Sequence, residues 1–187
     1  TKQIINALKS YDKVIDIHHA GTAMRFLSAY FAFKNGSEVL LTGSKRMKER
    51  PIKILVKALK DLGASIYYQN SEGFPPILIK GLESSGNYVK LSSSTSSQYI
   101  SALMLIAPRF SNGLNIELTG QTTSLPYIEM TKSLLKKIDI EVECKDQNIF
   151  ISEKKEDITK TITVESDWSS ASYFFSIVAL SSNANLI

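Results

Sequence analysis

Apolar and polar residues alternate with two different periods along this chain. Segments with the spacing of an amphipathic or buried helix take turns with short segments in which every second residue is apolar, as in a half-buried strand. These patterns predict helices near residues 2–9, 21–34, 51–62, 96–109, 126–138 and 169–181. They predict strands near residues 12–17, 38–42, 64–69, 76–80, 87–91, 114–118, 140–145, 148–152 and 161–165. Turn residues at 71–76 and 145–148 predict two hairpins.

The order of predicted elements repeats about every 76 residues. Leu-Thr-Gly at 41–43 returns at 118–120, and the helix start at 21 has its counterpart at 97. A third helix start with small and hydroxyl residues follows at 169. We therefore predict an α/β (α+β) fold of repeated βαβαββ units. Residues 1–187 would form a single partial domain, with units at about 1–82 and 83–158 and a truncated unit at 159–187.

Composition and chain ends change this picture in a few ways. The chain opens in a helical pattern and stops where the repeat requires a strand, which favours a piece of a longer protein. No apolar run reaches the ~20 residues that a membrane-spanning helix needs. The single Cys144 cannot form an internal disulfide, which favours a reducing cytoplasm. The net charge of +4 is spread over amphipathic helices, so we expect a cytoplasmic protein that binds neither membranes nor nucleic acid.

Residues 94–99, Ser-Thr-Ser-Ser-Gln-Tyr, are the first candidate for chemistry. They lie between a predicted strand and a predicted buried helix. The first N–H groups of a helix have no internal partner and carry the positive end of the helix dipole, so they favour an anion. Serine and threonine are also common N-caps, and an ordinary cap is the alternative from these residues alone. The recurrence of such helix starts in each unit favours a phosphate site.

The basic segment 45–50 is the second candidate. It holds four cations in six residues and precedes a helix that we predict to begin at Pro51. A solvated basic loop is one interpretation. The other is an anion clamp, because the planar fork of arginine pairs bidentately with carboxylate or phosphate. Arg50 lies nearest the helix start and is the strongest candidate of the segment.

Other polar residues at helix starts give weaker signals. His18 and His19 are followed by small residues that would let a ligand approach the backbone. Adjacent histidines point in different directions and no Cys or acidic cluster completes a ligand set, so we expect no metal. Ser124 and Tyr127 offer a hydroxyl and a phenol, although Ser124 is equally suited to be an N-cap before a proline. Asp167 is an unremarkable acidic cap of the third helix start.

Six motifs occur in order and at plausible spacing: Ala-Gly-Thr-Ala-Met-Arg at 20–25, Leu-Thr-Gly at 41–43, Arg-Met-Lys-Glu-Arg-Pro at 46–51, Ser-Ser-Gln-Tyr at 96–99, Ser-Leu-Pro-Tyr-Ile at 124–128 and Ser-Ser-Ala-Ser-Tyr-Phe at 169–174. With them the chain resembles the 5-enolpyruvylshikimate-3-phosphate synthase family over essentially its whole length. The resemblance implies a fold of the inside-out α/β barrel type, in which each of two similar domains has three βαβαββ units. The chain would cover most of one domain.

The resemblance also implies a reaction. Members transfer the enolpyruvyl group of phosphoenolpyruvate to the 5-hydroxyl of shikimate 3-phosphate and release phosphate, without a metal or an organic cofactor. By resemblance, shikimate 3-phosphate would contact Ser96, Ser97, Gln98, Ser124 and Tyr127. Phosphoenolpyruvate would contact Gly21, Arg50 and Gln98.

The chain departs from the family pattern in places. His19 stands where many members have Asn, Phe26 where many have Pro, and Leu125 where Lys is common. The family's Lys-Ser…Arg segment, and the other domain's catalytic Asp and Glu and its Lys and Arg clamps, have no counterpart here. The catalytic set is therefore incomplete. We predict that this polypeptide alone is inactive and that the missing second domain is its partner.

Two alternatives of other kinds can be compared with this one. The related transferase acting on UDP-N-acetylglucosamine requires a reactive loop cysteine, whereas Cys144 falls in a predicted hairpin. A non-enzymatic phosphate- or RNA-binding module could use the same βαβαββ unit. RNA binding is disfavoured because the sequence shows no platform of aromatic and arginine side chains for base stacking.

Overall fold

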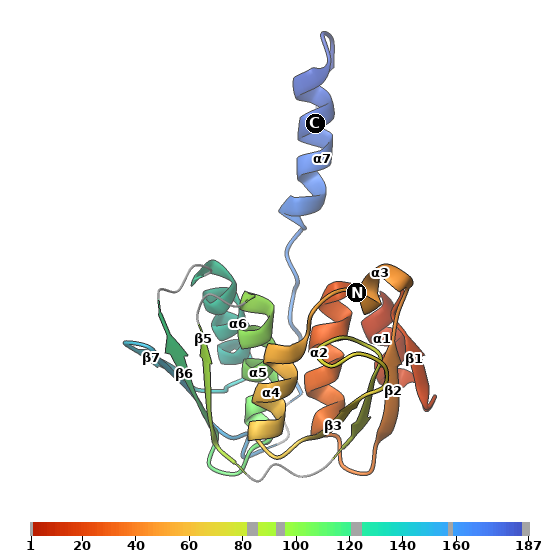
Figure 1. Ribbon diagram of the computed structural model, residues 1–187. Coiled ribbons are helices and arrows are strands. Elements are labelled where there is room, and N and C mark those ends of the chain that lie inside the picture. The colour runs from red at the N-terminus through yellow and green to blue at the C-terminus, as the bar shows by residue number, and fades with distance from the viewer. Residues whose placement is uncertain (1, 82–85, 93–95, 121–124, 157–158, 185–187) are drawn as a thin grey trace.

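Two four-stranded sheets with helices between them make up most of the structure (Figure 1). It is a computed structural model that describes residues 2–81, 86–92, 96–120, 125–156 and 159–184. The helices are α1 (Lys2–Lys9), α2 (Gly21–Ala32), α3 (Lys45–Lys48), α4 (Lys53–Asp61), α5 (Ser97–Ile106), the 3-10 helix Ala107–Arg109, α6 (Leu125–Lys137) and α7 (Trp168–Leu180). The strands are β1 (Val14–Asp16), β2 (Glu38–Thr42), β3 (Ser65–Tyr68), β4 (Ile77–Lys80), β5 (Tyr88–Ser92), β6 (Leu114–Thr119), β7 (Val142–Lys145) and β8 (Asn148–Ile151).

The two sheets have the same topology. Their strand orders are β1-β2-β4-β3 and β5-β6-β8-β7, and in each sheet the first pair is parallel while the other pairs are antiparallel. In the first pair, Val14 lies opposite Leu40 and Asp16 opposite Thr42, so the carboxyl ends of β1 and β2 lie together. The prediction of an α/β fold with a repeated βαβαββ unit is confirmed. Neither described sheet closes into a barrel.

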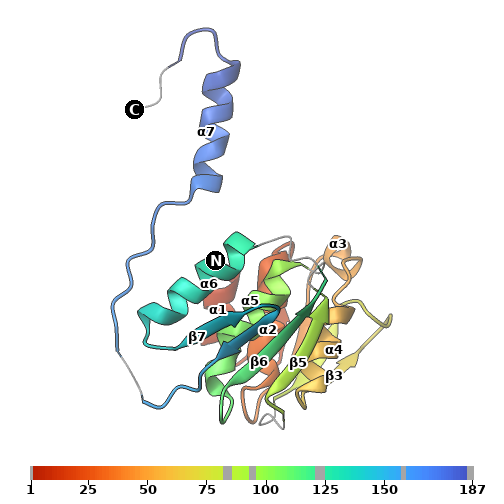
Figure 2. The same ribbon diagram turned by 90° about the vertical axis from the view of Figure 1, so that its left-hand side faces the viewer.

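One continuous apolar core joins the two repeats. Helix α2 packs against β2, β4 and α5, while α4 packs against β3 of its own sheet and β5 of the other (Figure 2). The core includes side chains from both units with no more than 1% exposure, among them Leu27, Leu41, Leu59, Leu103 and Ile116. The buried Ser101 hydroxyl is 2.8 Å from the hydroxyl of Thr131, which supplies the partner that a buried polar group needs and fixes α6 beside α5.

Two features near residue 51 differ from the prediction. Pro51 does not begin the helix, because α4 starts at Lys53 with Ile52 as its N-cap. A short helix, α3, also occupies part of the basic segment 45–50, where we predicted no helix and gave a solvated loop as one interpretation. The later start of α4 comes from contacts that sequence periodicity does not record: the Ile52 N–H donates to the carbonyl of Gly73 at 2.8 Å, and the Tyr99 hydroxyl donates to the carbonyl of Pro51 at 2.9 Å. Helix α3 is capped by Ser44, whose hydroxyl accepts the N–H of Met47 at 3.3 Å.

The predicted strand at 161–165 is wrong. These residues have no regular structure, although Thr-Ile-Thr-Val-Glu alternates as a strand does. A strand needs a neighbour for its ladder, and no described strand lies beside this segment. It leads instead into α7, which projects from the rest of the described chain in both views (Figures 1 and 2). The carboxylate of Asp167 accepts the N–H of Ser169 at 2.9 Å, so the predicted acidic cap is confirmed.

Helix α7 differs from the helices at the equivalent places of the first two units. Helices α2 and α5 pack against each other, whereas α7 has no buried residue. Most of its large apolar side chains, including Trp168, Phe174 and Leu180, are exposed. No described helix is both long and apolar enough to cross a membrane.

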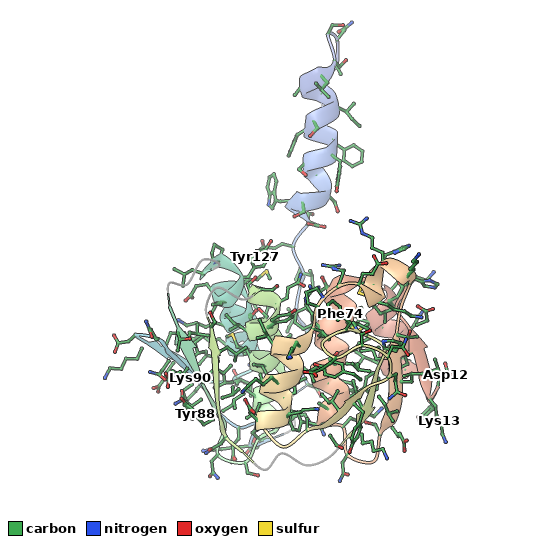
Figure 3. The ribbon with its side chains drawn as sticks, in the orientation of Figure 1. Asp12, Lys13, Phe74, Tyr88, Lys90 and Tyr127 are labelled. Atoms are coloured by element: carbon green, nitrogen blue, oxygen red, sulfur yellow. The ribbon has the colours of Figure 1, made fainter. Side chains whose placement is uncertain are left out.

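A surface cluster on the second sheet gives a test of its electrostatics. The carboxylate of Glu117 accepts the Tyr88 hydroxyl and lies 2.5 Å from Nζ of Lys90; Tyr88 and Lys90 both lie on β5 (Figure 3). The hydrogen bond from Lys90, followed by that from Tyr88, lowers the pKa of Glu117. Because the pKa of Glu117 is lower in the folded than in the unfolded chain, ionised Glu117 stabilises the fold at pH values above its unfolded-state pKa. This stabilisation is lost as the pH falls through its folded-state pKa.

We expect Lys90→Met to raise the pKa of Glu117 toward its ordinary value, because the main cause of the lowering is then absent. A carboxyl-detected NMR pH titration measures this directly. Lys80→Met is the matched control, since Lys80 pairs with Glu38 in the other sheet at 4.0 Å. An unchanged pKa of Glu117 in Lys90→Met would show that the ion pair does not persist in solution.

Candidate anion-binding site

The carboxyl ends of β1 and β2 place two loops against each other. Gly43 lies at their contact, where a Cβ atom would be 2.7 Å from the carbonyl oxygen of His18, so a larger residue does not fit. The N–H of Ser44 donates to that same carbonyl at 3.1 Å. The Ser44 hydroxyl is also 2.8 Å from Nδ1 of His19. These contacts hold the basic segment that begins at Lys45 next to the start of α2.

Two arginines converge on the first residue of α2. A Cβ atom on Gly21 would collide with the guanidinium of Arg50 and would lie 2.8 Å from Nη1 of Arg25. Glycine is therefore required for both side chains to reach the helix backbone. Within the described chain, neither arginine forms an ion pair with a carboxylate. Two unpaired guanidinium groups beside a helix N-terminus favour an anion.

Gln98 connects the starts of the two buried helices. Its Nε2 donates to Oγ1 of Thr22 at 3.1 Å, across 76 residues of sequence, which is the repeat distance. Ser96 is the N-cap residue of α5, yet its hydroxyl accepts no N–H of the helix. The side chain is exposed, whereas that of Ser97 is 8% exposed. The Ser96 hydroxyl thus does not act as an ordinary cap, which was the alternative raised by the sequence.

An open pocket of about 490 Å³ lies at this end of the first sheet. It is lined by His19, Arg46, Met47 and Arg50. Its volume falls in the range of small-molecule sites. Its lining residues in the described part of the chain include two arginines and no carboxylate, so the pocket is suited to a small anion. Among the described residues there is no group of three or more His, Cys, Asp or Glu that could hold a metal ion.

The structure brings some of the predicted residues together. Arg50 lies against Gly21, and the side chain of Gln98 is hydrogen-bonded to Thr22, the residue that follows Gly21. Ser96 and Ser97 lie at the same helix start as Gln98. Tyr127 lies on α6 with 57% of its surface exposed and makes no side-chain hydrogen bond within the described chain (Figure 3). Ser124, like Ser94 and Thr95, lies outside the described residues.

Other residues of the site were not singled out from the sequence. Arg25 is four positions after Gly21 in a helix, which places both on one face, and this spacing could have identified it. Tyr99 closes the candidate segment 94–99, but we predicted no role for its side chain. Of the two departures near this region, His19 lines the pocket, whereas Phe26 packs against the hydrophobic core.

Comparison with known proteins decides between the families considered above. The sequence model of EPSP synthase (3-phosphoshikimate 1-carboxyvinyltransferase) matches residues 1–187. The chain belongs to the EPSP synthase family. The resemblance inferred from the motifs is thereby confirmed, and the UDP-N-acetylglucosamine alternative is not supported.

Relatives in the EPSP synthase family extend beyond this chain. The 3-phosphoshikimate 1-carboxyvinyltransferase of Bacteroides fragilis (strain YCH46) is 47% identical over 187 residues, which are 100% of this chain and 45% of the relative. The 3-phosphoshikimate 1-carboxyvinyltransferase of Actinobacillus pleuropneumoniae serotype 5b (strain L20) is 41% identical over 166 residues, which cover 87% of this chain and 38% of the relative. The solved structure of EPSP synthase from Acinetobacter baumannii superposes on this chain with a TM-score of 0.71, which shows that the fold is shared. The match has 22% sequence identity and covers 88% of this chain and 36% of the Acinetobacter chain. The chain spans less than half the length of these relatives.

The contact at Gly21 gives a prediction that separates binding from stability. In Gly21→Ala, the three atoms nearest to the new methyl group belong to the flexible side chains of Arg50 and Arg25, so these side chains can move aside. We expect a melting temperature close to that of the parent chain together with weaker binding of a small anion, with phosphoenolpyruvate as the probe, because Arg50 is displaced. Calorimetric titration and thermal unfolding measure the two effects.

Gly86→Ala is the matched control, because a Cβ atom there meets nothing closer than 3.6 Å. It should leave both binding and melting temperature close to those of the parent chain. Parent-like phosphoenolpyruvate affinity in Gly21→Ala would show that the close approach of Arg50 to the helix start has no role in anion binding.

Proposed function

We propose that this chain supplies one half of the active site of an EPSP synthase. The complete enzyme would transfer the enolpyruvyl group of phosphoenolpyruvate to the 5-hydroxyl of shikimate 3-phosphate, with release of phosphate. Membership in the EPSP synthase family supports this reaction. The observation that carries the proposal is the convergence of Arg50 and Gly21 with the Gln98 helix start, because it places cations and helix N-termini where two anionic substrates could meet.

Each substrate would have its own part of the site. Arg50 and the backbone at Gly21 would hold the anionic groups of phosphoenolpyruvate. Shikimate 3-phosphate would bind at the start of α5 through Ser96 and Ser97, and it would also contact Ser124 and Tyr127. Gln98 would lie between the two substrates. Its hydrogen bond to Thr22 supports this role, because the amide is already fixed between the two helix starts.

The chemistry requires two negatively charged molecules to approach each other. Fixed cations and N–H donors offset their repulsion and order them without rearrangement during the reaction. The 5-hydroxyl would lose its proton to a base as its oxygen bonds to C2 of phosphoenolpyruvate, and C3 would take up a proton from an acid. The catalytic carboxylates expected in the rest of the enzyme would act as this base and acid. Loss of one proton from the resulting C3 methyl group, together with cleavage of the bond from C2 to the phosphate oxygen, would then release phosphate and give the product. No step in this sequence calls for a metal or an organic cofactor.

Residues 1–187 would belong to one domain with two complete βαβαββ units and part of a third. The partner would be the remaining length of the enzyme, which supplies the catalytic carboxylates and the further cations expected from the family resemblance. We place the protein in the cytoplasm, which is consistent with the free Cys144. We propose no nucleic-acid or membrane partner.

Phosphate release by this chain, alone and mixed with a polypeptide covering the rest of the Bacteroides fragilis relative, tests the proposal. We expect no turnover by the chain alone and measurable enolpyruvyl transfer by the mixture. The same mixture made with Arg50→Ala should be strongly impaired. Turnover by the chain alone would refute the proposal that this chain supplies only half of the active site. An inactive mixture of two folded polypeptides would refute the contribution of this chain.

A further inference from the structure

Tyr99 lies where the two parts of the proposed site meet. It follows Gln98 in the first turn of α5, and only 6% of its surface is exposed. Its hydroxyl donates to the carbonyl of Pro51 at 2.9 Å. Pro51 directly follows Arg50 and lies outside α4. One hydrogen bond therefore fixes the loop that carries Arg50 to the helix that carries Gln98.

The aromatic ring of Tyr99 makes a second contact with the site. The Cζ atom of Arg25 lies 5.5 Å from the ring centroid, within the range of a cation–π interaction. Arg25 also lies against Gly21, beside Arg50. Its Nε is buried and has no hydrogen-bond partner. Two guanidinium groups at one glycine repel each other, so their positions need support from neighbouring groups. The ring of Tyr99 contacts the guanidinium of Arg25, and its hydroxyl holds Pro51, the residue that follows Arg50.

The other hydrogen bonds of this loop do not reach α5. The N–H of Arg50 donates to Met47 at 3.1 Å, and the N–H of Ile52 donates to Gly73 at 2.8 Å. Both bonds connect backbone atoms within the first repeat. Across the described residues, the hydroxyl of Tyr99 forms the hydrogen bond that connects residues 50–52 with the second repeat.

We propose that Tyr99 is a positioning residue that sets Arg50 relative to Gln98 without touching either substrate. The inference rests on the proposed function, in which Arg50 binds phosphoenolpyruvate and Gln98 lies between the substrates. Loss of the hydroxyl frees the loop of Arg50 but leaves the backbone and hydroxyls of Ser96 and Ser97 in place. Phosphoenolpyruvate binding therefore depends on the Tyr99 hydroxyl, whereas shikimate 3-phosphate binding does not.

Tyr99→Phe tests this, because it removes the hydroxyl and keeps the ring beneath Arg25. Calorimetric titrations of the chain with phosphoenolpyruvate and, separately, with shikimate 3-phosphate measure the two affinities. Nitrogen relaxation of the arginine Nε–H signals reports the order of the Arg50 side chain without any ligand. The matched control is Tyr30→Phe, since the ring of Tyr30 packs in α2 against Phe31.

In Tyr99→Phe we expect phosphoenolpyruvate to bind about three- to tenfold more weakly, as for the loss of one hydrogen bond. Shikimate 3-phosphate should stay within about twofold of the parent chain, and the Arg50 Nε–H should lose order. Tyr30→Phe should change none of these values.

Unchanged phosphoenolpyruvate affinity with unchanged Arg50 order would overturn the inference. Equal weakening of both ligands with a lower melting temperature would also overturn it, because that result indicates a purely structural role. If the parent chain binds no phosphoenolpyruvate but Tyr99→Phe still loses Arg50 order, the proposed function fails and the positioning role of Tyr99 stands.

Discussion

Arg50→Ala is expected to weaken phosphoenolpyruvate binding by roughly 10- to 150-fold without unfolding the chain. The guanidinium of Arg50 lies against Gly21 and pairs with no carboxylate in the described structure, so its removal leaves no internal partner unsatisfied. A hydrogen bond to a charged group contributes about 1.5–3 kcal/mol, which corresponds to this loss of affinity. Calorimetric titration measures the affinity, and thermal unfolding verifies that the fold is retained.

Two further variants identify the cause of that loss. Arg50→Lys keeps the charge but loses the planar fork, so its affinity should fall between those of the parent chain and Arg50→Ala. Lys48→Ala removes a cation from the same basic segment, at a residue that does not line the pocket. It should bind nearly as well as the parent chain. If Lys48→Ala and Arg50→Ala bind equally weakly, the segment acts as a diffuse basic loop and contains no specific anion site.

Phe110→Ala is expected to destabilise the chain by about 3–5 kcal/mol, as large-to-small substitutions of buried aromatic residues do. Phe110 is 1% exposed, and its ring meets that of Phe33 edge to face at a centroid distance of 5.0 Å. Phe33 ends α2 of the first repeat, while Phe110 follows the 3-10 helix of the second. The pair therefore joins the two repeats. Against a total stability of about 5–15 kcal/mol, this loss is severe.

Urea unfolding of Phe110→Ala measures this loss, and Phe150→Ala provides the comparison. Phe150 lies in β8 of the second sheet with 39% of its surface exposed, so its truncation should cost much less. A loss below about 1 kcal/mol in Phe110→Ala would show that the two repeats do not share one core.

The repeat explains why so much of the fold could be predicted. Short alternating segments and buried helices recur with one spacing, and the shared strand order of the two sheets follows from it. The prediction failed where tertiary contacts decide the local structure. Residues 161–165 have the alternation of a strand but no neighbouring strand with which to pair. Pro51 is suited to begin a helix, but hydrogen bonds from Tyr99 and to Gly73 hold residues 51–52 outside α4.

The site was predictable as a set of residues but not as an arrangement. The motif strings indicated Gly21, Arg50 and Gln98, yet nothing in their spacing shows that the first two touch or that the third is bonded to Thr22. Tyr99 belongs to the candidate segment 94–99, but no role was predicted for its side chain, because a tyrosine next to an apolar helix is most often a core residue. Its hydroxyl acquires a role only when the fold brings Pro51 to it, 48 residues away in sequence.

An amide NMR titration of this chain with shikimate 3-phosphate, with inorganic phosphate as the control, tests the central claim most directly. The claim is that the described helix starts form half of a substrate site. It predicts saturable shifts at Ser96, Ser97 and Gln98 that are larger than those caused by phosphate. A well-dispersed spectrum in which shikimate 3-phosphate moves none of these signals would contradict it.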